Sequence, residues 1–169
     1  MKAYFHIFTS CSALLLLAAC QPTAHTAEQP ADPHTYFPIS IGGEELKLQL
    51  AMTPAEQQKG LMFRETLPTD HGMLFLFKRP ERRSFYMRNT EIPLDIGYFD
   101  ADGTLREVHK LFPYDENPVP SASHAILIAV ETNRGWFQRN KVTPGATIDM
   151  EALKSALERR GHAHPLLND

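Results

Sequence analysis

Residues 60–99 read GLMFRETLPTDHGMLFLFKRPERRSFYMRNTEIPLDIGYF and carry the strongest structural signals in this chain of 169 residues. Residues 72–77 are apolar on both faces, which is typical of a strand in the middle of a packed sheet. A charged loop is expected at residues 78–83. In the strand expected at residues 94–98, alternation places Asp95 on the face opposite the apolar side chains.

The residues before this stretch predict a hairpin and a short helix. Alternating apolar residues indicate two strands, at 36–41 and 46–50. Pro38 places the first of them at a sheet edge, because proline has no N–H to donate to a second neighbour. A capping box predicts a helix of about two turns over residues 53–60.

The residues after this stretch predict more short elements around one long loop, residues 112–123. We expect strands at residues 84–87, 104–112, 124–130 and 146–148, and a short helical turn within residues 135–142. Asp149 caps a C-terminal helix. No βαβ alternation is visible. We therefore predict an all-β fold, a small β-sandwich or partly closed barrel, with one short helix near residues 53–60 and a C-terminal helix.

The first nineteen residues have the pattern of a lipoprotein signal peptide, residues 1–19, because Lys2 precedes an apolar run and small residues lead directly to Cys20. Cys20 is the predicted lipidation site, and a lipid there would tether the chain to a membrane. The alternative, an uncleaved membrane anchor, is disfavoured by the polar residues within the run. Residues 20–34, rich in Pro, Ala and Thr, form a flexible tether in this interpretation.

The rest of the chain is long enough for one compact domain, the β domain at residues 35–150, followed by a C-terminal helix and tail at residues 151–169. The formal net charge is −3, which gives no indication of nucleic-acid binding. With Cys11 removed and Cys20 acylated, no thiol remains for a disulfide, a zinc site or a cysteine nucleophile. No cofactor and no metal site are predicted.

Three motifs stand out in the central stretch: Gly60-Leu61-Met62-Phe63-Arg64, Leu67-Pro68-x-Asp70-x-Gly72-Met73-Leu74-Phe75, and Phe85-x-Met87-x-Asn89-Thr90-x-Ile92-Pro93-Leu94-Asp95-Ile96. Together they resemble a widespread prokaryotic family, the domain of unknown function numbered 192. The resemblance extends from about residue 39 to residue 150. Tyr86 and Arg88 replace the tryptophan and lysine that the family usually shows. The resemblance implies a small β-sandwich, often secreted or membrane-tethered, with no established activity.

A set of polar and aromatic residues lies within these apolar motifs and forms the candidate ligand-binding site: Arg64, Tyr86, Arg88, Asn89, Thr90 and Asp95. An arginine fork can bind a carboxylate or phosphate, and an aromatic ring beside amides and carboxylates suits sugars. The structural alternative is that an Arg–Asp pair and an asparagine only clamp a loop, since buried charges must be paired. No catalytic residue is assigned.

Two further functions remain open at this point. An envelope hydrolase could use Asp95, Asp70 or Glu131 as its general base, provided that two carboxylates converge in one pocket. A copper-binding protein could use soft ligands drawn from His71, Met73, Met62, Met87 and His109, although methionines at strand spacing usually fill a core.

A basic segment, Lys78, Arg79, Arg82 and Arg83, could contact anionic lipid, although a solvated turn explains it as well. Taken together, the sequence predicts a membrane-tethered periplasmic lipoprotein. It would bind an envelope glycan, a peptide or a small polar ligand. Gln21, directly after the lipidation site, favours the outer over the inner membrane.

Overall fold

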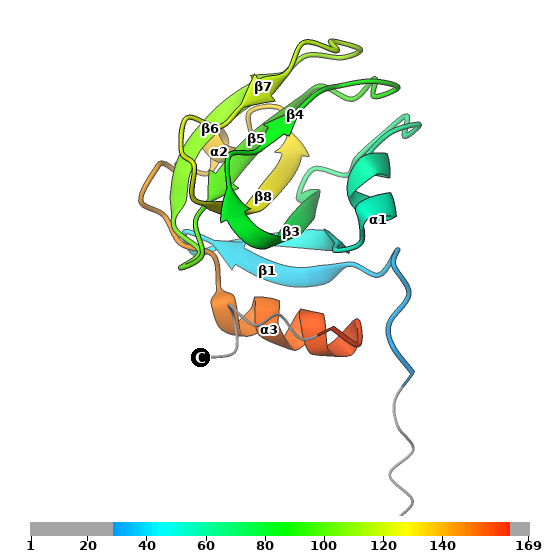
Figure 1. Cartoon of the computed structure of the whole chain (residues 1–169), viewed down its shortest axis with the longest axis vertical. Helices are drawn as coiled ribbons and strands as arrows, with labels where there is room; N and C mark the ends of the chain where they lie inside the picture. Colours follow the sequence, from blue (N-terminus) through cyan, green and yellow to red (C-terminus); the bar gives the residue numbers. More distant parts are fainter. Residues whose placement is uncertain (1–28, 163–169) are drawn as a thin grey trace, which may run out of the picture.

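The computed structural model describes residues 29–162, which form a β-rich domain with three short helices (Figure 1). The predicted signal peptide, the lipidation site Cys20, the first part of the tether and the end of the tail lie outside the described residues. Within the described part, no helix combines the length and the apolar character that a membrane crossing requires.

Six strands form the main sheet in the order β1-β2-β3-β8-β5-β6, and β4 and β7 form a separate pair. The strands are β1 Phe37–Ile41, β2 Glu44–Ala51, β3 His71–Glu81, β4 Ser84–Phe85, β5 Leu94–Phe99, β6 Leu105–Leu111, β7 Val119–Pro120 and β8 Ile126–Asn133. The helices are α1 Pro54–Lys59, α2 Trp136–Arg139 and α3 Met150–Arg159. The predicted β-rich class with short helices is therefore confirmed.

The N-terminal hairpin and the helix that follows match the sequence pattern. The first strand, which contains Pro38, is an edge strand of the sheet. Thr53 caps α1 through its side chain, and Glu56 bonds back to the backbone N–H of Thr53, which completes the capping box. However, β3 then pairs with β2 in parallel. The sheet is mixed, and the short helix serves as a crossover that was too brief to produce a βαβ pattern in the sequence.

Two segments differ from the expected boundaries. Residues 78–81, expected in a loop, belong to β3, and a break in register between Leu76 and Glu81 bulges the charged residues out of the ladder. Charged side chains are compatible with a strand where they face solvent. The long loop 112–123 contains β7, which pairs with β4.

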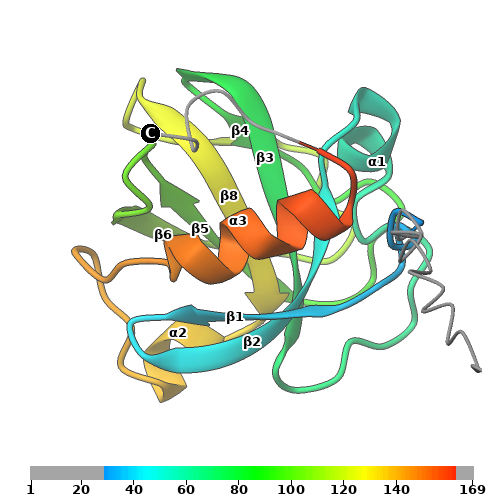
Figure 2. The same ribbon diagram turned by 90° about the horizontal axis from the view of Figure 1, so that it is seen from below.

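Each face of the main sheet carries its own apolar core. One face, here called the helical face, packs Leu74 and Val130 against α2 and α3. The other, here called the pocket face, carries Phe75, Ile96 and Tyr98. Figure 2 shows α3 crossing the sheet from the helical side. The alternation predicted for residues 94–98 is confirmed, since the neighbours of Asp95 in β5 lie on the pocket face.

Residues 147–148 link the two edges of the sheet, β1 and β6. Ile148 forms an isolated bridge with Ile41 at the end of β1, and Thr147 forms one with Thr104 just before β6. The strand expected at residues 146–148 is thus reduced to these two bridges. These two bridges connect the end of β1 to the start of β6, and the rest of the two edge strands stays unpaired with each other. The sheet is therefore curved but not closed.

The C-terminal helix is fixed at both ends. Asp149 caps its first turn by accepting a hydrogen bond from the N–H of Ala152. At its other end the buried Arg160 donates to the carbonyl of Leu50 and contacts the carboxylate of Glu56 at 2.6 Å. Burial works to raise the pKa of Glu56, but bonds from Thr53, Met52 and Arg160 outweigh it and hold that pKa below its ordinary value. The ion pair therefore joins α3 to the start of α1.

Candidate functional site

A buried acid, Glu131, lies in the middle of the pocket face. It belongs to β8 and pairs with Met73 of β3 on one side and Ile96 of β5 on the other. Its exposed fraction is only 5%. No hydrogen bond from the described residues reaches its carboxylate, and the remaining electrostatic influence on it comes from Arg64. A buried carboxyl with no partner is uncommon and costs stability.

Burial raises the pKa of Glu131 to about 8, from an ordinary value of 4.5, although the positive charge of Arg64 works in the opposite direction. The same buried region raises the pKa of Tyr98, with the charges of Glu131 and Glu107 adding to the effect of burial. At neutral pH the Glu131 side chain is therefore mostly a neutral acid. In that form it can donate one hydrogen bond as well as accept others.

The Glu131 carboxyl is part of the lining of an open pocket of about 330 Å³. The pocket lies between the C-terminal end of α1, the middle of β3 and the segment 82–86. A Cβ atom added at Gly60 would lie 3.9 Å from a Glu131 carboxylate oxygen, so the end of α1 lies beside the acid. Volumes of this order are at the lower end for small-molecule sites.

Aromatic rings form one wall of this pocket. Phe85 contacts Phe75 edge-on, with ring centroids 4.9 Å apart, and lies 6.4 Å from Phe77. Phe85 also packs against the buried ring of Tyr98. Tyr86 completes the wall and is partly exposed. The wall combines apolar faces with edges that favour ring-shaped ligands.

Basic residues surround the opening. Lys59, Arg82 and Arg83 all line the pocket. The guanidinium of Arg83 lies 3.8 Å from the centroid of the Phe77 ring and contacts Glu81 at 2.5 Å. Burial lowers the pKa of Arg83, although Glu81 acts against the shift. The Nε of Arg83 is buried without a hydrogen-bond partner in the described part of the chain.

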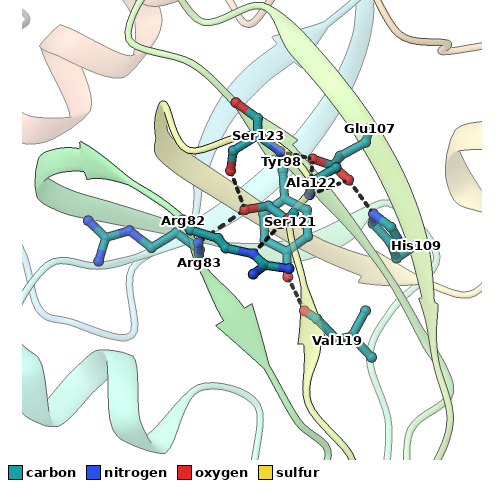
Figure 3. Close-up of polar contacts among 9 residues, drawn as sticks. All are labelled: Arg82, Arg83, Tyr98, Glu107, His109, Val119, Ser121, Ala122 and Ser123. Atoms are coloured by element: carbon teal, nitrogen blue, oxygen red, sulfur yellow. Dashed lines mark hydrogen bonds and ion pairs between the residues drawn. The ribbon is translucent and has the colours of Figure 1, made fainter.

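A strap made of residues 119–123 holds these arginines in place (Figure 3). Arg82 donates from Nε to the carbonyl of Ser121, and the N–H of Arg83 donates to the Ser121 hydroxyl. The Tyr98 hydroxyl donates to the carbonyl of Val119 at 2.6 Å. The strap therefore attaches the pocket rim to the sheet at several points.

Glu107 of β6 anchors the far end of the strap. Its carboxylate accepts hydrogen bonds from the N–H groups of Ala122 and Ser123 and lies 2.6 Å from Nε2 of His109 (Figure 3). Burial works to raise the pKa of Glu107, but these bonds outweigh it and lower that pKa. Glu107 is thus a structural carboxylate, in contrast to the unpartnered Glu131.

Strained loops lie beside the pocket. Phe63, Asn89 and Tyr114 adopt the left-handed conformation, with φ of 62°, 52° and 59°. These loops are joined by backbone bonds, from the N–H of Phe63 to the carbonyl of Asn89 and from that of Tyr114 to the carbonyl of Thr90. A bulky side chain at positive φ is an outlier of the kind found at functional sites. Thr90 lines the pocket, so this cluster sets part of its shape.

The structure separates the six residues that the sequence suggested as a binding site. Tyr86 and Thr90 line the pocket. Arg88 is exposed and pairs with Glu116 at 2.8 Å. The described hydrogen bond of Asn89 is made by its backbone, and its left-handed conformation accounts for an asparagine at this position. Arg64 lies to one side, bonded to Gln49 and the hydroxyl of Tyr36.

Asp95 belongs to a structural clamp at the other side of the sheet. Its carboxylate accepts the N–H of Gly135 at 2.7 Å and lies 3.3 Å from Nε of Arg134. Arg134 also donates to the carbonyl of Leu94, the first residue of β5, and to that of Leu111, the last residue of the neighbouring β6. The structural alternative drawn from the sequence was an Arg–Asp pair that clamps a loop. Such a pair exists, but the arginine that pairs with Asp95 is Arg134 and not Arg64.

The geometry also bears on the two other functions. Of the three carboxylates considered for a hydrolase, Glu131 alone lines the pocket, since Asp70 bonds to the indole of Trp136 and Asp95 to Gly135. Among the five copper candidates, His71 packs against Tyr36, His109 against Glu107, and Met73 and Met87 lie in the core. Residues 29–162 contain no group of three or more His, Cys, Asp or Glu side chains arranged to hold a metal ion.

Comparison with known proteins identifies relatives by sequence and by fold. The DUF192 family, described as "Uncharacterized ACR", matches residues 37–150. No curated protein sequence matches the chain. A crystal structure from Sinorhizobium meliloti, provisionally described as a transcription regulator, is similar at 30% identity with a TM-score of 0.66, covering 70% of this chain and 96% of that one.

A second similar crystal structure is a protein of unknown function from Novosphingobium aromaticivorans. It is 36% identical, with a TM-score of 0.65, and the match covers 73% of this chain and 96% of that one. Both proteins are thus spanned almost completely by the β domain described here.

Proposed function

This chain belongs to the DUF192 family, and we propose that it is a ligand-binding module of the cell envelope whose pocket, with Glu131 as an internal hydrogen-bonding group, takes a small polar ligand or the end of an envelope glycan. The lipoprotein pattern around Cys20 supports the envelope location, with the outer membrane favoured. Residues 20–34 serve as the tether in this proposal.

The observation that carries the proposal is the unpartnered carboxyl of Glu131. Folding has placed it at 5% exposure in an open pocket, at a cost that a leucine at the same position would avoid. Groups that destabilise a fold in this way are typical of sites where a ligand supplies the missing hydrogen bonds.

The composition of the pocket supports a ligand that is both ring-shaped and polar. The exposed ring of Tyr86 offers a stacking surface, while Gln57, Ser84 and Thr90 add amide and hydroxyl oxygens. This mixture of flat apolar faces and hydrogen-bonding groups suits sugars and short polar polymers.

The test is binding by the full chain, solubilised in detergent, to peptidoglycan fragments and envelope oligosaccharides. Isothermal titration calorimetry should detect binding by the wild type and a loss of about tenfold or more in Glu131→Leu, since the variant cannot donate or accept a hydrogen bond. Glu44→Leu, the same substitution at an exposed position at the start of β2 and outside the pocket lining, is the matched control. Identical titrations for wild type and Glu131→Leu would refute the proposed site.

The provisional description of the Sinorhizobium protein as a transcription regulator is not extended to this chain. The formal net charge of −3 gives no indication of nucleic-acid binding. A gel-shift titration with duplex DNA of mixed sequence, expected to show no salt-sensitive complex, checks this choice.

A further inference from the structure

The charges that line the pocket are unbalanced. Lys59, Arg82 and Arg83 contribute three cations, and Glu131 is the one acid among the lining residues. At neutral pH burial keeps Glu131 mostly protonated, so it contributes little negative charge. The pocket therefore presents a net positive environment to a ligand.

Two of the three cations have no acidic partner in residues 29–162. Arg83 is neutralised by Glu81 at 2.5 Å. Arg82 uses only its Nε, on the carbonyl of Ser121, and its terminal nitrogens are free to bind a ligand. Lys59 is exposed at the end of α1, where it makes no ion pair with the described residues. Lys59 belongs to α1 and Arg82 to the segment after β3, and both residues line the pocket.

This arrangement discriminates between ligand charges. An amine would have to enter beside three cations and would need Glu131 to ionise, which burial opposes. A carboxylate or phosphate would instead pair with the unneutralised cations, and a neutral oxygen on the same molecule could accept the proton of Glu131. Anions are therefore favoured over cations of the same size.

We propose, building on the binding function above, that the ligand is a ring-bearing anion, a carboxylated or phosphorylated sugar, whose anionic group pairs with Lys59 and Arg82, whose ring packs against Tyr86, and one of whose oxygens accepts a hydrogen bond from Glu131. Both kinds of anionic sugar share this chemistry. The experiment below distinguishes carboxylate from phosphate.

The test compares four sugars that differ in one group: glucose, glucuronate, glucose 6-phosphate and glucosamine, titrated into the full chain in detergent at pH 7 and low salt. We expect glucuronate, glucose 6-phosphate or both to bind about tenfold or more tightly than glucose, and glucosamine to bind least. The preference should shrink at high salt because the contacts lie near solvent. The tighter of the two anions identifies the preferred group.

Two variants with equal charge loss locate the effect. Lys59→Gln with Arg82→Gln removes the two unneutralised pocket cations, whereas Lys47→Gln with Lys110→Gln removes two exposed lysines elsewhere. The anion preference should disappear only in the first. Circular dichroism and thermal unfolding establish that both variants remain folded.

Other outcomes overturn the inference. Equal affinity for glucose and both anions, or preference for glucosamine, would exclude an anion site while leaving a binding function intact. An anion preference that persists without Lys59 and Arg82 would exclude these two residues as the anion site. Failure of all four sugars would also exclude it. In that case the titrations with envelope fragments and Glu131→Leu decide separately whether the pocket binds anything.

Discussion

Asp95 and Glu131 lie on the neighbouring strands β5 and β8, one residue out of register, because Asp95 pairs with Thr132 and Ile96 pairs with Glu131. Their side chains consequently point to opposite faces of the sheet. Asp95 is held by Gly135 and Arg134, whereas Glu131 has no hydrogen-bond partner in the described chain. One acid stabilises the fold, and the other is available for a ligand.

Glu131 should make the protein less stable as the pH rises. Its pKa is about 8 in the folded protein against an ordinary 4.5, so between these values the folded state holds a proton that the unfolded state has lost. The free energy of unfolding should therefore fall by about 1.4 kcal/mol per pH unit from about pH 5 to pH 8 and then level off. Urea denaturation across this range measures it.

The Glu131→Gln variant isolates this effect, because glutamine has a similar shape and does not titrate. The difference in unfolding free energy between wild type and variant should change with pH by the amount expected for Glu131 alone, since the contributions of the other acids are the same in both proteins and cancel. A difference that stays constant from pH 5 to pH 8 would show that Glu131 titrates normally in the folded protein.

Asp95→Asn should destabilise the domain by about 2 to 3 kcal/mol, because it leaves the partly buried Arg134 without its charge partner. The estimate is at the low end for buried pairs since 27% of the Arg134 side chain is exposed. Glu116→Gln, which breaks the exposed pair with Arg88, is the control and should destabilise the domain much less, because solvent screens that pair. Equal losses in the two variants would contradict the clamp. Denaturant midpoints supply the comparison.

Arg160→Met should cost about 3 kcal/mol, because the methionine fills the same space but breaks the buried contact with Glu56 and the bond to Leu50. The loss should be shared with Glu56→Gln, so the double variant should be less destabilised than the sum of the single ones. Strict additivity would indicate that the pair does not couple. Lys154→Met, in the same helix but with its partner Glu151 exposed, serves as the control.

Asn89 should respond to substitution through its backbone. Since φ is 52°, Asn89→Gly should keep the stability of the wild type within about 0.5 kcal/mol, whereas Asn89→Ala should lose about 1 kcal/mol. Thermal unfolding of the two variants measures the difference. If the alanine variant were as stable as the glycine variant, the left-handed conformation would not explain this asparagine.

Much of the fold followed from local patterns. The capping box at Thr53, the edge position of the strand containing Pro38 and the cap at Asp149 were all predictable, because each depends on a few neighbouring residues. The parallel pairing of β2 with β3 was not, because strand direction depends on where a short crossover returns to the sheet. The bulge in β3 was missed since its charged residues read as a loop.

The candidate site was predicted less well than the fold. Tyr86 and Thr90 were selected and do line the pocket, but Phe75 and Phe77 of β3 and Lys59 of α1 were not, because only the folded arrangement of these elements brings them beside Tyr86. Glu131 was considered only as a possible base. The available signal was an acid at the end of the apolar run 126–130 and within the same buried strand.

The first described residues leave the domain beside the end of α3, where the N–H of Ala31 donates to the carbonyl of Arg159. That helix covers one side of the sheet, and the pocket lined by Glu131 lies on the other side. Under the proposed lipid attachment at Cys20, the chain would join its anchor from the side of the domain that carries α3. The pocket lies on the opposite side, so the attachment would not obstruct the entry of a ligand.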